Sequence, residues 1–123
     1  MAEKTGKTVL YACSGASNVG QIANSVVITL AESGFASMSC IAGIGAHDQK
    51  MIDSAKIVDR VIAIDGCGVA CARKILEHAG VSVTKWINVT DFGVKKNHNK
   101  LHVEIAELDN IMSNVIANLG ANI

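Results

Sequence analysis

The stretch Arg60-Val-Ile-Ala-Ile-Asp65, followed by Gly66-Cys67-Gly68, decides the fold. Its nearly continuous apolar run is typical of a strand that is buried on both faces of a parallel sheet. The two glycines then break the strand on either side of the cysteine. A strand covered on both faces needs helices on both sides, so this segment predicts an α/β protein.

The same alternation of strand and helix continues on both sides of this strand. The remaining predicted strands are 8–13, 36–41 and 85–89, and the predicted helices are 19–33, 47–56, 69–79 and 101–119. In the last helix, one apolar stripe is predicted to face the sheet: Leu101, Ile105, Leu108, Met112, Val115 and Leu119. Short connections imply parallel strands with right-handed crossovers. We therefore expect one domain over residues 1–123, a three-layer, doubly wound, Rossmann-like sheet of about four strands in the order 2-1-3-4.

Composition narrows the classes of partner. Lys and Arg together number 11, as do Asp and Glu, so no long-range field would gather nucleic acid or anionic lipid. One Trp, one Tyr and two Phe are too few for a platform that stacks bases. Neither a signal-peptide core nor an apolar segment of membrane-spanning length is present in the sequence. We expect a cytoplasmic protein with no nucleic-acid or membrane partner, and the pattern indicates no particular oligomeric state.

The four cysteines all fall near the carboxyl ends of predicted strands. Cys13 closes the first strand, Cys40 lies near the end of the second, Cys67 follows the third, and Cys71 lies in the first turn of the next helix. Ligands of such sheets bind at this edge, where the winding reverses. Thiols stay reduced in the cytosol, so metal ligands or reactive thiols are favoured over a disulfide framework. Four thiolates would complete a closed tetrahedral zinc site, and zinc is the metal ion we expect as partner and cofactor.

Two other functions remain open at this point. Cys67 and Cys71 are four residues apart, and a helix beginning near Gly68 would stack them at its positive end, which favours a thiol redox or sulfur-transfer enzyme. Against this reading, the spacing is Cys-x-x-x-Cys, and the chain has no proline to face a thioredoxin-like site. Four cysteines would also hold an iron–sulfur cluster.

The chain resembles the DGC-domain family, whose members are described as zinc-binding proteins, in four motifs that occur in order. These motifs are Ala12-Cys13-Ser14-Gly15, Cys40-Ile-Ala-Gly-Ile-Gly45, Asp65-Gly66-Cys67 and Cys71-Ala72. The resemblance covers nearly the whole chain. It implies the same four cysteines as zinc ligands, and it implies no defined biochemical activity.

Weaker signals surround these motifs. Gly15 and Gly20 have the spacing of a phosphate loop, but Gln21 and Ile22 replace its Lys and Ser/Thr, so a helix cap is favoured. Asp65, just before Cys67, would orient hydrogen bonds around the cysteines, or it would bond the backbone of the neighbouring loop and stabilise the turn. Residues 91–100 would form a mobile lid in which Lys95 and Lys96 offset thiolate charge.

Overall fold

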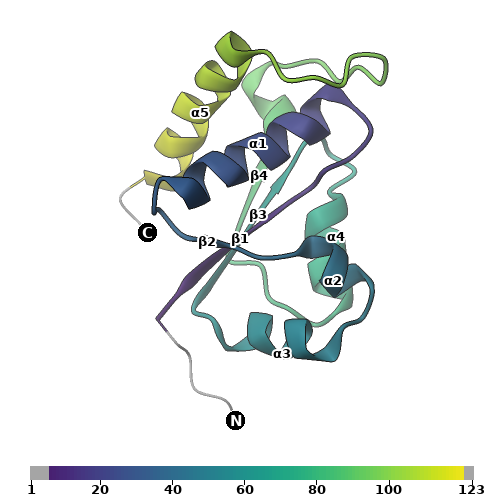
Figure 1. Ribbon diagram of the computed structural model, residues 1–123, viewed down its shortest axis with the longest axis vertical. Helices are drawn as coiled ribbons and strands as arrows, with labels where there is room; N and C mark the ends of the chain where they lie inside the picture. The colour runs from purple at the N-terminus through teal and green to yellow at the C-terminus, as the bar shows by residue number, and fades with distance from the viewer. Residues whose placement is uncertain (1–5, 121–123) are drawn as a thin grey trace.

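A computed structural model describes residues 6–120 and shows a four-stranded parallel sheet in the order β2-β1-β3-β4 (Figure 1). The strands are β1 (Thr8–Ala12), β2 (Ser37–Met38), β3 (Arg60–Asp65) and β4 (Lys85–Asn88). β1 pairs with β3 from Thr8↔Arg60 to Ala12↔Ile64, so the two strands end side by side. The predicted fold class and strand order are therefore confirmed.

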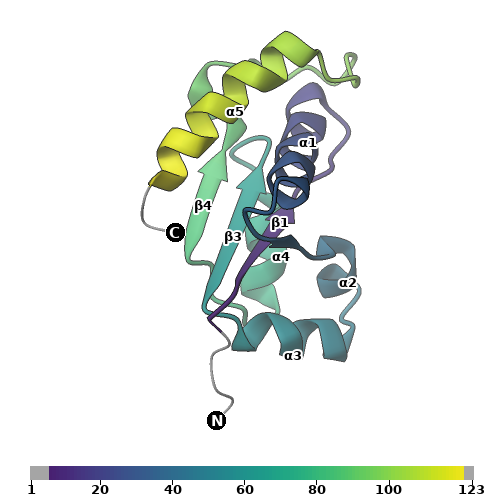
Figure 2. The ribbon, with the colours of Figure 1, turned by 60° about the vertical axis from the view of Figure 1, so that its left-hand side comes forward.

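Helices cover both faces of the sheet (Figure 2). One face carries α1 (Asn18–Glu32) and α5 (Ile105–Leu119), and the other carries α2 (Ile41–Gly45), α3 (Gln49–Ile57) and α4 (Cys71–His78). Alternate residues of β3 serve the two layers, since Ile62 and Ile64 pack beneath α1 whereas Val61 and Ala63 pack beneath α4. This double burial accounts for the continuous apolar run.

The second connection differs from the prediction. The predicted strand 36–41 is reduced to Ser37–Met38, and Cys40 lies outside it as the residue that caps α2. Residues 41–45 form that short helix, which the sequence did not predict. A run of small and apolar residues fits either a strand or a helix, and here the Cys40 sulfur accepts a hydrogen bond from the Gly43 backbone N–H, 3.4 Å away, which starts the helix.

Two later helices begin after their predicted starts. α4 begins at Cys71, so Cys67 lies in the preceding loop and the two cysteines do not stack on one helix. α5 begins at Ile105, whose side chain is 78% exposed, and Leu101 is 50% exposed. The predicted stripe was wrong at these two residues. The fully buried residues of α5 are Ile111, Val115 and Leu119.

Candidate functional site

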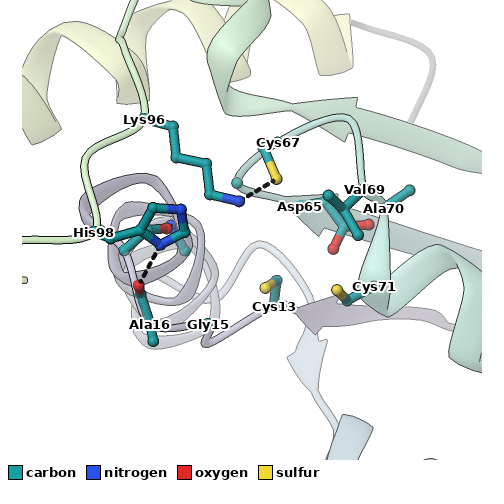
Figure 3. Close-up of a pocket in the computed structure, with 13 residues that line it drawn as sticks. Cys13, Gly15, Ala16, Asp65, Cys67, Val69, Ala70, Cys71, Lys96 and His98 are labelled. Carbon is teal, nitrogen blue, oxygen red and sulfur yellow. Dashed lines mark hydrogen bonds between the residues drawn. The ribbon is translucent and has the colours of Figure 1, made fainter.

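A cavity of about 190 Å³ lies at the carboxyl ends of β1 and β3, where the order of the sheet reverses. Three cysteines line it: Cys13 after β1, Cys67 after β3, and Cys71 at the start of α4. Lys96 and His98 line it from the loop between β4 and α5. We call this cavity the cysteine pocket (Figure 3). Sequence reasoning placed these three cysteines at one edge, and the structure brings them around one space.

Cys13 forms the half-buried floor of the pocket. Burial raises the pKa of its thiol above the ordinary value, and the charges of Asp65 and Cys71 raise it further. Backbone hydrogen bonds from Gly15 and Gly66 oppose these effects because they favour the thiolate. A Cβ at Gly15 would lie 3.3 Å from the Cys13 sulfur, so the glycine leaves space beside this thiol.

Cys67 is carried by a loop that packs directly on the start of α1. A Cβ on Gly66 would lie 2.5 Å from the backbone of Val19 and Gly20, which only glycine avoids. The loop then turns through a hydrogen bond from the Ala70 N–H to the Cys67 carbonyl, 3.1 Å long. Ala70 itself is buried in the left-handed conformation, with φ of 57°. The glycine and this turn together fix where Cys67 stands.

Asp65 anchors the other end of this loop from a position that is 1% exposed. Its carboxylate accepts hydrogen bonds from the backbone N–H groups of Ala72 (2.8 Å) and Arg73 (3.1 Å) and from Trp86 Nε1 (2.9 Å). These bonds satisfy donors at the start of α4, a task that the Ala70 side chain cannot perform. Asp65 therefore holds Cys71 at the pocket, the loop-supporting role expected from the sequence.

Lys96 brings a positive charge into the pocket. Its Nζ lies 3.4 Å from the Cys67 sulfur, and the two side chains meet in Figure 3. His98 stands beside it, with Nδ1 3.2 Å from the Ala16 carbonyl oxygen. Of the two lysines that the sequence predicts to offset thiolate charge, Lys96 lines the pocket and Lys95 does not, and the Lys96 ammonium can donate to a Cys67 thiolate.

Asn18 pins the loop that carries Lys96 to the first turn of α1. Its side chain donates to the Lys95 carbonyl (2.8 Å) and accepts from the Asn97 N–H (2.6 Å), while its own N–H donates to the Asn97 carbonyl (3.1 Å). Asn18 is buried, and the loop residues are nearly eighty positions away in sequence. Sequence reasoning missed Asn18, since nothing near it in the chain signals this partner.

Cys40 does not line the cysteine pocket. It is exposed at the start of α2, and its sulfur is turned to the Gly43 N–H. β2 is separated from β3 by β1, so Cys40 leaves the sheet one strand further from Cys67 than Cys13 does. The four predicted ligands are thus divided into three around the pocket and one beside it.

The donor set of the pocket suits a soft metal ion, because thiolates are the preferred ligands of zinc. Within residues 6–120, however, no three Cys, His, Asp or Glu side chains are grouped closely enough to form a ready coordination shell. The donor chemistry therefore fits zinc, and the three thiols would have to move toward one another to bind it. None of the helices between residues 6 and 120 is both long and apolar enough to cross a membrane.

Comparison with known proteins identifies the family. The model of the DGC domain matches residues 9–115, a range that includes all four cysteines. The chain is 35% identical over 92 residues to the anaerobic and virulence modulator AnvM of Pseudomonas aeruginosa, a match covering 75% of this chain and 70% of that protein. No solved structure matches the chain. The chain belongs to the DGC-domain family.

Proposed function

We propose that this chain is a zinc-binding protein whose ligands are the thiolates of Cys13, Cys67 and Cys71. The observation that carries the proposal is that these thiols come from two connections far apart in the sequence, one after β1 and one after β3, and line one pocket. Three protein ligands leave a fourth position on zinc open, the arrangement of reactive or exchanging zinc sites rather than closed structural ones. Zinc bound there would supply a Lewis acid at the pocket.

The charge balance supports the same proposal. Three thiolates and Zn²⁺ together carry one negative charge, and Lys96 brings one positive charge to within hydrogen-bonding distance of Cys67. Asp65 does not compete as a ligand, because its two carboxylate oxygens already accept three hydrogen bonds. The chain thus offers three soft donors and a compensating cation in one place.

Cys40 is not needed in this proposal. Its exposed position and its bond to the Gly43 N–H give it a task at the start of α2. A closed four-cysteine site, the expectation from the shared edge of the sheet and the family resemblance, would require Cys40 to release that bond and cross the end of β1.

A second candidate is a thiol redox or sulfur-transfer enzyme, and Lys96 is the observation that favours it. An ammonium beside a sulfur is one of the environments that activate cysteine nucleophiles. Cys13 and Cys71 stand in the same pocket as partners for Cys67. A regulatory use of either chemistry would also agree with the word modulator in the name of AnvM.

Zinc titration of the reduced, metal-free chain separates these candidates. We expect native mass spectrometry to show one zinc per chain and a pH-stat to record the release of protons, because thiols lose them on binding. A chain that binds less than about a tenth of an equivalent, with no proton release, would sink the zinc proposal. Rapid alkylation of one pocket cysteine in that case would favour the enzyme.

A further inference from the structure

We propose that Lys96, held in position by Asn18, makes the cysteine pocket select small anionic reactants at Cys67. The inference deepens the proposed function by naming the class of molecule that approaches the thiolate site, and it rests on Cys67 being a reachable thiolate. Lys96 lies on the lining of the pocket, 3.4 Å from the Cys67 sulfur. An anion that reacts at this sulfur must therefore come close to the ammonium.

The rest of the pocket gives this charge a local effect. Asp65 is the other charged lining residue, and its carboxylate is buried and turned to the start of α4 by its hydrogen bonds. Burial is the main cause of the raised pKa of Cys13, and the negative charge of Asp65 raises that pKa further. His98 also lines the pocket, on the same loop as Lys96. Attraction for anions is therefore expected at Cys67 rather than uniformly over the three thiols.

Asn18 fixes the stretch of backbone from which the Lys96 side chain extends to Cys67. Its three hydrogen bonds to the backbone of Lys95 and Asn97 hold the residues on either side of Lys96. Without them, the loop would keep only contacts such as that of His98 with the Ala16 carbonyl. Asn18 touches neither a cysteine nor a reactant in this proposal, so it is a positioning residue.

The test compares two thiosulfonate reagents with the same reacting group and opposite charge, sulfonatoethyl and trimethylammonioethyl methanethiosulfonate, whose intrinsic difference in rate cancels when two cysteines of one chain are compared. In both reactions the cysteine thiolate attacks the sulfenyl sulfur, a disulfide bond forms, and the sulfur–sulfonyl bond breaks to release methanesulfinate. The metal-free chain is modified at pH 8, quenched and digested, and each cysteine is quantified by mass spectrometry. The ratio of the two rates at one cysteine removes the effect of its thiolate fraction.

Cys40 is an internal control because it is exposed and lies outside the pocket. We expect the anion-to-cation ratio at Cys67 to exceed that at Cys40 by about fivefold or more at low salt. Added salt should reduce the excess. K96M should lower the ratio at Cys67 to that of Cys40, and K96R should preserve the excess. N18A should lower it most of the way, whereas N114A, which removes an exposed side-chain hydrogen bond to the Asn110 carbonyl within α5, should leave it unchanged.

Three results would overturn the inference: equal ratios at Cys67 and Cys40, an excess that survives K96M, or no reaction at Cys67 with either reagent. If N18A folds and its anion-to-cation ratio at Cys67 still exceeds that at Cys40 by as much as in the unchanged chain, Asn18 does not position Lys96. If N18A fails to fold, K96M and K96R still decide the role of Lys96. Failure of zinc binding with the excess intact would overturn the proposed function alone, and zinc binding without the excess would overturn this inference alone.

Discussion

The connections that follow β2 and β3 both carry a cysteine at the start of a helix, yet only one of those cysteines reaches the pocket. Cys71 opens α4 and lines the cavity, because Asp65 caps that helix and leaves the thiol free. At the start of α2, the hydrogen-bond acceptor is the sulfur of Cys40 itself, where α4 has the carboxylate of Asp65. Topology brings a cysteine to the edge of the sheet, and the capping of the helix decides whether its thiol is available.

The largest expected effect comes from breaking the β3 connection itself. Gly66→Ala should lower the free energy of unfolding by more than about 3 kcal/mol, because its Cβ would overlap the backbone at the start of α1. Gly68→Ala is the matched control in the same loop, since a Cβ there meets open space, and we expect a change below about 1 kcal/mol. Urea denaturation measures both. Equal losses in the two variants would show that the loop does not pack on α1 as described.

The next prediction tests the division of the cysteines. Replacing Cys13, Cys67 or Cys71 by Ser should weaken zinc binding more than about 100-fold, because each variant removes a proposed ligand. Cys40→Ser should weaken it less than about threefold. Competition with a chromophoric chelator gives the four affinities. A loss at Cys40 as large as the others would restore the four-cysteine site.

A smaller effect is expected when the charge beside the thiols is removed. K96M should weaken zinc binding about three- to tenfold. Three thiolates with bound zinc carry one negative charge, and this variant removes the positive charge beside them. K96R should retain most of the affinity, since it keeps the charge. The same chelator competition, repeated at high salt, checks the assignment: the deficit of K96M should shrink there. Tighter zinc binding by K96M would contradict the charge balance.

The smallest effect concerns pH. Burial raises the pKa of Cys13 in the folded chain, so this state holds the proton more firmly than the unfolded chain does. The resulting stability is complete below the ordinary value of 9.0 and is lost as pH rises through the raised value. Cys13→Ser should therefore flatten the alkaline fall of the unfolding free energy in metal-free protein. Tyr11→Phe is a comparison variant, because burial also raises the pKa of Tyr11, from 10.0, and removing it should flatten the fall only at higher pH.

Local patterns were sufficient for β1, β3 and β4 and for the edge that Cys13, Cys67 and Cys71 share, and they failed for the second strand, for Cys40 and where distant contacts decide. The apolar run 60–65 predicted β3 because both faces of that strand are buried. The stripe of the last helix was wrong at Leu101, which lies in the loop before α5, and at Ile105, which is the exposed first residue of α5. That loop is held at α1 by Asn18, a contact that no local pattern signals. The sequence pointed to Lys96 together with Lys95. That Lys96 is the lysine beside Cys67 follows from how the loop lies on α1, which the sequence does not show.

One measurement tests the central claim most directly: site-resolved alkylation of all four cysteines after one equivalent of zinc is added to the reduced chain. The account predicts that zinc protects Cys13, Cys67 and Cys71 together while Cys40 reacts as fast as in the metal-free chain. Protection of Cys40 along with the other three, or protection of none, would contradict it.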